Sequence, residues 1–591
     1  KPWQTALPHC ATFARALSLT GIDPQRVGFM GFSAGGFLTR SVVERGGVDR
    51  PDFAAPIYPN MAAMTVPADA PPMFVAIAAD DFLLARQQGV PLLDSYRAAG
   101  KSIEFHLFSA GGHGFGAGPD DSPEEGWMEL MYRWMRIAGP AANGEEVTMI
   151  DRRSLMASAV ALSASVMTSK SALARSAKPR PLDPQFPEGF LWGAATAAHQ
   201  IEGNNLNADL WVIENVPGTI FAERSGDAAN SFELWPVDLD LVKGMGLNSY
   251  RFSLEWARIE PDEGHFSNAM LDHYKAMIEG CRARGLKPVV TFNHFTTPRW
   301  FAAKGGWHNP ESSALFARFC ERAARHLAAG IELATTLNEP NLAGVIGEIL
   351  PPPLVAGDKA TQEAAAKQLG VALYTPGVAL YIKEPKTYRA NMMEGHRRGV
   401  AAIKAVRPDL PVGVSLAMID DQAVGKNSMR DRIRERYYNE WLRLAGETCD
   451  FIGVQNYERK VWTDKGELPS PADARRNTGG AEVWPGSLAG AVRYAHAVTK
   501  LPVYVTEHGV NSDDDALRQW LIPEALTELK RAIDDGVPVR GYIHWSLIDN
   551  FEWGFGYKYR FGLHSFDQST FQRTAKPSAA ILGRIARRNR L

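Results

Sequence analysis

Short apolar runs alternate with amphipathic stretches along the first part of the chain. Up to residue 138 the apolar runs have the length and composition of strands, and the stretches between them have helical spacing. The predicted strands are 26–32, 53–58, 73–79 and 103–108. The predicted helices are 8–20, 34–45, 86–99 and 124–137. This alternation is typical of a parallel sheet with crossover helices, so an α/β unit is expected here.

The same alternation continues over residues 181–591, with eight strand candidates separated by helical stretches. The predicted strands are 190–196, 248–256, 288–295, 331–337, 411–416, 451–457, 502–506 and 541–546. Polar and aromatic residues follow nearly every one of them, where a barrel enzyme builds its site. We therefore predict a (β/α)8 barrel, with an open doubly wound sheet as the alternative. The long segment 342–385 is expected to shape the mouth of the site.

Length and composition narrow the possible functions. A chain of 591 residues exceeds one ordinary core, so two or more domains are expected. Its formal net charge of −2 argues against a nucleic-acid partner and against a polybasic membrane partner. No run reaches the roughly 18 apolar residues that a membrane span needs. The four cysteines are scattered and have no metal-binding spacing.

Residues 139–180 are predicted to be a linker. They contain the twin arginine Arg152–Arg153, a weakly apolar stretch and the small-residue site Ala172–Ala174, in the order of a twin-arginine export signal. Met149 is then a candidate start of the second protein, joined to an upstream segment. Export or a periplasmic location is expected if translation starts near Met149, and a cytoplasmic location otherwise.

Two glutamates carry the strongest chemical signal. Glu339 follows the apolar run 331–337 and Glu507 follows 501–505, so both lie at the carboxyl ends of predicted strands four and seven. Splitting a glycosidic bond with retention needs two carboxyl groups about 5–5.5 Å apart, one as proton donor and one as nucleophile. We predict Glu339 as the acid/base and Glu507 as the nucleophile, kept ionised by donors such as Arg251 and Tyr457.

Six motifs in a fixed order give residues 181–591 a resemblance to the β-glycosidases of glycoside hydrolase family 1. The motifs are Phe190-Leu-Trp-Gly-Ala-Ala-Thr-Ala-Ala-His-Gln-Ile-Glu-Gly203, Tyr250-Arg-Phe-Ser253, Asn293-His-Phe295, Leu337-Asn-Glu-Pro340, Thr506-Glu-His-Gly509 and Trp545-Ser-Leu-Ile-Asp-Asn-Phe-Glu-Trp553. The resemblance implies a retaining double displacement on small or oligomeric β-glycosides, without metal or cofactor. The residues that would hold the sugar are Gln200, His294, Asn338, Trp545, Glu552 and Trp553.

Three features depart from the family pattern. His508 follows the second glutamate where the family usually has Asn, and Thr-Thr-Pro follows His294 and Phe295 where Trp or Asp often follows the His. The 342–385 segment does not resemble the loop that the family commonly has at this position. These departures affect the expected leaving-group preference more than the chemistry.

The first 138 residues carry a second set of candidate catalytic groups. Ser33 lies in Gly31-Phe-Ser-Ala-Gly35 between a strand and a helix, and Asp81 and His113 follow later strands. This order resembles the C-terminal half of an acetyl-xylan-esterase-like α/β-hydrolase. Because no oxyanion loop precedes Ser33, a truncated and inactive remnant is expected. Its bare sheet edge is expected to be covered in a homodimer.

Three functional hypotheses follow. The leading one is a retaining exo-β-glycosidase, with glucose as the first choice of sugar. The second is a bifunctional glycosidase and carbohydrate esterase acting on plant polysaccharide fragments. The third is a sugar-binding barrel without activity, which the presence of both glutamates disfavours.

Overall fold

The computed structural model describes residues 28–46, 51–85, 90–113, 123, 126–137, 183–343, 345 and 350–591. The chain forms two compact units, residues 1–175 and 176–591. The predicted linker 139–180 with its twin arginine lies outside the described residues, as does the predicted helix 8–20.

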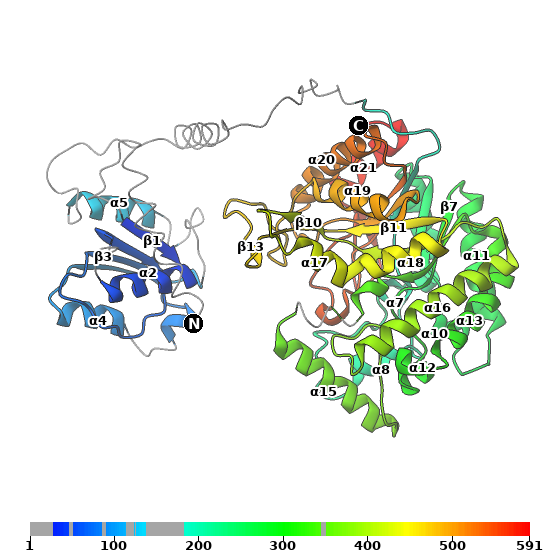
Figure 1. Cartoon of the computed structure of the whole chain (residues 1–591), viewed down its shortest axis with the longest axis horizontal. Helices are drawn as coiled ribbons and strands as arrows, with labels where there is room; N and C mark the ends of the chain where they lie inside the picture. Colours follow the sequence, from blue (N-terminus) through cyan, green and yellow to red (C-terminus); the bar gives the residue numbers. More distant parts are fainter. Residues whose placement is uncertain are drawn as a thin grey trace. The chain divides into compact units, whose positions relative to one another are not determined.

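The first unit is built on a four-stranded parallel sheet with the order β1-β2-β3-β4. Its strands are β1 (Gly28–Phe32), β2 (Phe53–Ile57), β3 (Met73–Ala78) and β4 (Ile103–Phe108). Helices α2 (Ala34–Arg45) and α4 (Pro91–Ala98) lie on one face of the sheet, and α5 (Trp127–Ile137) lies on the other (Figure 1). The central strand β3 is buried along its whole length, which explains its continuous apolar run. The predicted α/β sheet is confirmed.

The second unit is a closed eight-stranded parallel barrel, as predicted. Its strands are β5 (Leu191–Ala195), β6 (Ser249–Ser253), β7 (Lys287–Asn293), β8 (Leu333–Asn338), β9 (Val412–Ala417), β11 (Phe451–Asn456), β14 (Val503–His508) and β15 (Val539–Trp545). Strand β15 pairs with β5 and closes the ring. Closure buries both faces of every strand, so the carboxyl ends of all eight strands surround one mouth.

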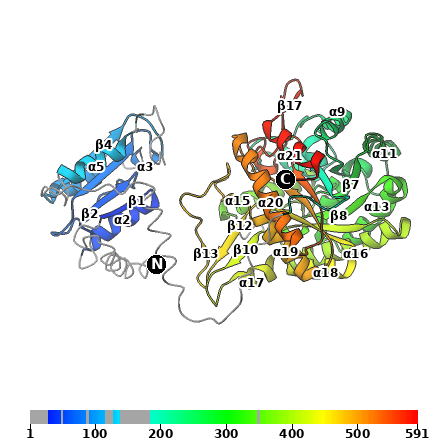
Figure 2. The same ribbon diagram turned by 90° about the horizontal axis from the view of Figure 1, so that it is seen from above.

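An outer layer of helices covers the barrel (Figure 1, Figure 2). Its main members are α9 (Ser231–Gly244), α11 (Asn268–Ala283), α13 (Ser312–Leu327), α16 (Pro385–Val406), α18 (Glu440–Thr448), α19 (Ser487–Thr499), α20 (Asp515–Asp534) and α21 (Pro577–Arg588). Aromatic side chains fill the space between strands and helices. Trp256 and Trp307, for example, are fully buried and pack against Phe316.

The 342–385 segment contains helix α15 (Pro352–Leu369), which packs against α8 (Asp209–Asn215). Two buried carboxylates fasten the part of the segment that follows α15. Asp209 accepts hydrogen bonds from the Gly377 N–H (2.6 Å) and the Thr297 hydroxyl (2.8 Å). Asp358 accepts the N–H groups of Leu380 and Tyr381, both at 2.9 Å. The segment is therefore held by internal bonds close to the barrel mouth.

Among the described residues, no helix combines the length and apolar character that crossing a lipid bilayer requires. The same residues hold no group of three or more His, Cys, Asp or Glu side chains arranged for a metal ion.

Candidate active site

Glu507, near the end of β14, accepts hydrogen bonds from three side chains that lie on or just after other strands of the barrel. Arg251 Nη1 on β6 lies 2.5 Å from Oε1, and Gln455 Nε2 on β11 lies 2.8 Å from the same oxygen. The Tyr457 hydroxyl donates to Oε2 at 2.6 Å. All three donors favour the ionised carboxylate. The structure thus brings the two predicted supporting residues, Arg251 and Tyr457, onto Glu507.

Arg251 and Gln455 also connect Glu507 to strand β8. Arg251 Nη2 donates to the Asn338 side-chain oxygen at 2.6 Å, and Gln455 Nε2 donates to the same oxygen at 2.8 Å. These two contacts fix the orientation of the Asn338 amide, so its nitrogen faces His294 Nε2 at 3.2 Å. The ends of strands β6, β7, β8, β11 and β14 are therefore joined in one polar network.

Glu339 follows β8 directly and has a left-handed backbone, with φ at 46°. In contrast to Glu507, no side-chain donor within the described residues holds its carboxyl group. Burial raises the pKa of Glu339 well above its usual range, and the charge of Glu507 raises it further, against the opposing effect of Arg251. Glu339 is therefore protonated at a pH where an ordinary glutamate is ionised.

Burial raises the pKa of Glu507 as well, but Arg251 and Tyr457 oppose that rise. Tyr457 remains a donor because burial and the charge of Glu507 raise its own pKa well above 10. Two close carboxyl groups share their titration. Since the donors gather on Glu507, the first proton to leave the pair is the one on Glu507, and Glu339 keeps its proton to higher pH.

His294 contacts two predicted sugar-binding tryptophans. Its ring stacks on Trp545 at 5.7 Å and on Trp553 at 6.1 Å between centroids. Burial and Arg251 lower its pKa well below 6.5, so the ring is neutral. Because Asn338 donates to Nε2, the proton of the neutral ring lies on Nδ1, which is buried and has no partner in the protein. That N–H is available to a substrate hydroxyl.

Gln200 and Glu552 complete the set of predicted sugar-binding residues. Gln200, on α7 (Ala198–Ile201), donates through Nε2 to the Asn550 side chain and to the Phe551 carbonyl, at 3.0 and 2.9 Å. Its Oε1 is buried without a partner. Glu552 accepts a long hydrogen bond of 3.4 Å from Trp545 Nε1, and burial raises its pKa well above 4.5. A bound polar ligand beside Gln200 would give this buried oxygen a hydrogen-bond partner.

The residue that departs from the family pattern, His508, faces away from this network. Its Nδ1 is 3.0 Å from the Tyr542 hydroxyl, which is 3.1 Å from His544 Nδ1. Successive residues of a strand point to opposite faces of the sheet, so the His508 side chain projects to the other face of β14 from Glu507. Burial lowers the pKa of His508 to about 3. The substitution therefore adds no charge beside Glu507.

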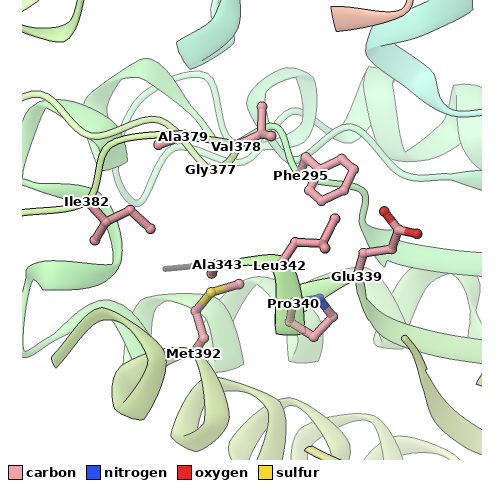
Figure 3. Close-up of a pocket in the computed structure, with 10 residues that line it drawn as sticks. All are labelled: Phe295, Glu339, Pro340, Leu342, Ala343, Gly377, Val378, Ala379, Ile382 and Met392. Carbon is pink, nitrogen blue, oxygen red and sulfur yellow. The ribbon is translucent and has the colours of Figure 1, made fainter. Parts of the chain in front are cut away.

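A small pocket, with about 20 Å³ of space for the centre of a water molecule, adjoins Glu339 (Figure 3). Among the described residues that line it, Glu339 alone has a polar side chain. Apolar residues of the 342–385 segment, among them Val378 and Ile382, form much of its wall together with Phe295. The segment thus reaches the barrel mouth beside Glu339.

In the first unit the structure brings Ser33, His113 and Asp81 together. Ser33 Oγ is 2.7 Å from His113 Nε2, and His113 Nδ1 is 2.9 Å from the fully buried Asp81 carboxylate. Ser33 has φ at 51°, the sharp turn expected of a nucleophile between a strand and a helix. Any Cβ at position 31 would lie 2.3 Å from the Gly35 carbonyl oxygen, so the turn requires Gly31.

Sequence reasoning missed Gln455 and Asn550. Val454 pairs with Val505 but Gln455 pairs with Glu507, so a bulge at Thr506 on β14 places Gln455 opposite Glu507. Neither the bulge nor this pairing has a local sequence signal. Asn550 lies within the last of the six motifs, and its place in that motif was the sequence signal that could have identified it.

Comparisons with known proteins agree with the two-unit organisation. Residues 182–444 and 442–591 match the family described as Glycosyl hydrolase family 1, and residues 4–135 match the Dienelactone hydrolase family. The second match confirms an α/β-hydrolase fragment and gives its family as dienelactone hydrolase, where the sequence resemblance pointed to acetyl-xylan esterases.

Curated relatives and solved structures cover the barrel unit. A β-glucosidase of Agrobacterium sp. is 30% identical over 465 residues, which span 69% of this chain and 96% of the relative. β-Glucosidase A of Thermotoga maritima is 26% identical over 466 residues, 69% of this chain and 99% of the relative. The crystal structure of β-glycosidase BGL167 shares 43% identity with a TM-score of 0.65, and covers 69% of this chain and 98% of its own.

Proposed function

The chain belongs to glycosyl hydrolase family 1, and we propose that it is a retaining exo-β-glycosidase with glucose as its preferred sugar. The observation that carries this proposal is the different environment of two buried carboxyl groups. Three side chains donate to Glu507, whereas Glu339 has burial and the adjacent charge to keep it protonated. One carboxylate and one carboxylic acid side by side are what a retaining glycosidase needs.

In the proposed first step, Glu507 attacks the anomeric carbon while the bond to the leaving oxygen breaks. Glu339 gives its proton to that oxygen. Oε1 of Glu507 already accepts two donors, while Oε2 accepts Tyr457 alone. Oε2 therefore retains a lone pair for the new C–O bond.

In the second step, Glu339 acts as a base and takes a proton from water. The water oxygen attacks the anomeric carbon and the ester bond to Glu507 breaks. Two displacements at the same carbon restore its configuration, Glu507 is again a carboxylate and Glu339 is again protonated.

The sugar site is proposed to consist of Gln200, His294, Trp545, Glu552 and Trp553, with Asn338 next to the reacting carbon. The free Oε1 of Gln200 and the free Nδ1–H of His294 support this assignment, because a sugar hydroxyl satisfies both groups. A wrong epimer leaves them unpaired, which costs binding energy. Trp545 and Trp553 present aromatic surface to the sugar ring.

A screen of nitrophenyl β-glycosides followed by proton NMR of the first-formed sugar tests the proposal. We expect the β-glucoside to be cleaved fastest and the β-anomer to appear first. Glu507→Gln is expected to abolish turnover, because an amide does not form the glycosyl ester. An α-anomer as first product, or near-native turnover of Glu507→Gln, contradicts the mechanism.

A second candidate function is ester hydrolysis by the first unit, as in a bifunctional glycosidase and carbohydrate esterase. The hydrogen-bonded chain from Ser33 through His113 to Asp81 favours it. Ser33 would attack the acyl carbon and His113 would take the hydroxyl proton. Ser33-dependent release of nitrophenol from nitrophenyl acetate distinguishes this function from the inactive remnant expected from the sequence.

Homodimerisation through the first unit also remains a proposal. Among the described strands, β1 lies at one edge of the sheet and pairs with β2, and its Met30 and Phe32 side chains are 45% and 40% exposed. An exposed apolar strand edge favours pairing with a second copy. Light scattering of the full chain and of Met30→Lys tests this proposal. A dimer that the substitution weakens is expected, and a monomeric full chain contradicts it.

A further inference from the structure

Strands β14 and β15 carry two site residues at their mouth ends, Glu507 and Trp545, but the backbone ladder between these strands stops short of both. Its last pair is Val505 with Tyr542. Each strand end is paired on its other side: β11 pairs with β14 as far as His508, and β5 pairs with β15 as far as Trp545. The link between the two strand ends therefore depends on groups outside their ladder.

A chain of three buried side chains makes this link. His508 Nδ1 lies 3.0 Å from the Tyr542 hydroxyl, which lies 3.1 Å from His544 Nδ1, and all three residues are at most 2% exposed. At one end of the chain, His508 follows Glu507 in the sequence. At the other end, His544 precedes Trp545. Because side chains alternate along a strand, the chain lies on the opposite face of the barrel wall from both site residues.

The direction of these hydrogen bonds follows from the single proton of the Tyr542 hydroxyl, which donates to one ring nitrogen and accepts an N–H from the other. Both rings are neutral, because burial lowers the pKa of His508 to about 3 and that of His544 well below 6.5. His544 Nε2 is buried and has no partner among the described residues. A proton there would be an unpaired donor, so His544 carries its proton on Nδ1 and donates it to Tyr542. Tyr542 then donates to His508 Nδ1.

The bond thus requires an acceptor at the δ position of residue 508. The side-chain oxygen of asparagine is as many bonds from the backbone as the Nδ1 atom of histidine, so it can accept the same hydroxyl proton. Leucine has nearly the shape of asparagine but no acceptor. His508 and the asparagine that is usual in the family therefore share the one feature that this bond needs.

We propose that His508 is a positioning residue that, through its bond to Tyr542, holds the Glu507 carboxylate in register with the sugar. The proposal rests on the proposed glycosidase function. Gln455 ties Glu507 to β11 from the inner side of the barrel. His508 ties the same strand end to β15, the strand that carries Trp545. Attack on the anomeric carbon is sensitive to this spacing, because a misplacement of about 1 Å costs up to about 10²-fold in rate.

The test compares His508→Leu with His508→Asn, which differ in the acceptor and hardly in shape. With a nitrophenyl β-glycoside, His508→Leu is expected to lower kcat about tenfold and to leave KM within about twofold, because a misplaced nucleophile weakens the transition state more than sugar binding. His508→Asn is expected to keep kcat within about twofold of the wild type. Tyr542→Phe removes the hydroxyl at the centre of the chain and is expected to match His508→Leu. Combining these two is expected to add little, since both break one link.

Tyr494→Phe is the matched control. It removes a hydroxyl of α19 that donates to the Asn439 side-chain oxygen, just before α18, at 2.8 Å. It is expected to lower the melting temperature and leave kcat unchanged, as a merely structural hydroxyl does.

Crystal structures of the two His508 variants give a readout that needs no turnover. The Glu507 carboxylate is expected to move by more than about 0.5 Å relative to Trp545 in His508→Leu and to stay in place in His508→Asn. Equal kcat in the two variants, a change in KM alone, or an unmoved carboxylate in His508→Leu overturns the inference. A wild-type chain that cleaves no β-glycoside contradicts the proposed function instead, and the crystal structures still decide whether His508 positions Glu507.

Discussion

Replacing Gln455 with leucine is expected to raise the pH at which the enzyme becomes active. Gln455 Nε2 donates to Glu507 Oε1 at 2.8 Å, and a hydrogen bond to a charged group contributes about 1.5–3 kcal/mol. One pKa unit corresponds to about 1.36 kcal/mol, so losing the full bond would raise the pKa of Glu507 by about one to two units. Arg251 and Tyr457 remain as donors, which favours the lower end, about one unit.

The sign of the change follows from which group is affected. Gln455 stabilises the ionised form of Glu507, so its loss makes protonation easier and the acidic limb of the pH profile moves to higher pH. The basic limb reports the proton on Glu339, which Gln455 does not contact, and is expected to stay in place. The active pH range therefore narrows from its acidic side only.

The assay is kcat/KM for a nitrophenyl glycoside across the pH range, because this ratio reports the ionisations of the free enzyme. Asn456→Ala is the matched control, since the Asn456 side chain donates to the carbonyl oxygens of Met418 and Glu458 instead of to Glu507. It is expected to lower the melting temperature and leave both limbs in place. An unmoved acidic limb in Gln455→Leu, or an equal shift in both variants, refutes the reasoning.

Three further predictions test neighbouring parts of the structure. Glu339→Ala is expected to slow release of poor leaving groups about 10²–10⁴-fold while sparing the first step with dinitrophenyl glycosides, which burst kinetics will show. Tyr457→Phe is expected to move the acidic limb upward as Gln455→Leu does, because it removes the donor to Oε2. Asp358→Asn replaces the carboxylate that accepts two backbone N–H groups and so weakens those hydrogen bonds. It is expected to lower the free energy of unfolding by about 1–3 kcal/mol, measured by denaturant titration.

Apolar runs predicted the barrel correctly because each of its strands is buried on both faces. All eight predicted strands are present, with ends shifted by a few residues. The apolar runs before Glu339 and Glu507 also placed both glutamates at one mouth, since closing the barrel brings the strand ends together whatever their distance in sequence.

Other features have no signal in the sequence because they depend on register or on contacts between distant segments. Gln455 lies opposite Glu507 because of a bulge at Thr506 on β14, and the available proton on His294 follows from the orientation of the Asn338 amide. The contact between Asp209 and Gly377 joins residues 168 positions apart. Nothing in the 342–385 segment indicates that contact locally, although the sequence placed the segment at the mouth.

The charge balance of the site explains why its two glutamates differ. Arg251 is the permanent cation that bonds the Glu507 carboxylate, and both side chains are almost completely buried. With His294 neutral and Glu339 protonated, Arg251 and Glu507 cancel each other. Ionising Glu339 adds a buried charge without a partner, which is costly in a poorly solvated site. In the proposed glycosyl-enzyme Glu507 is a neutral ester, so the Glu339 carboxylate is the anion that balances Arg251. When the ester breaks, Glu507 regains its charge beside Arg251 and Glu339 takes a proton from water, so in this mechanism one buried arginine sets the roles of both carboxyl groups.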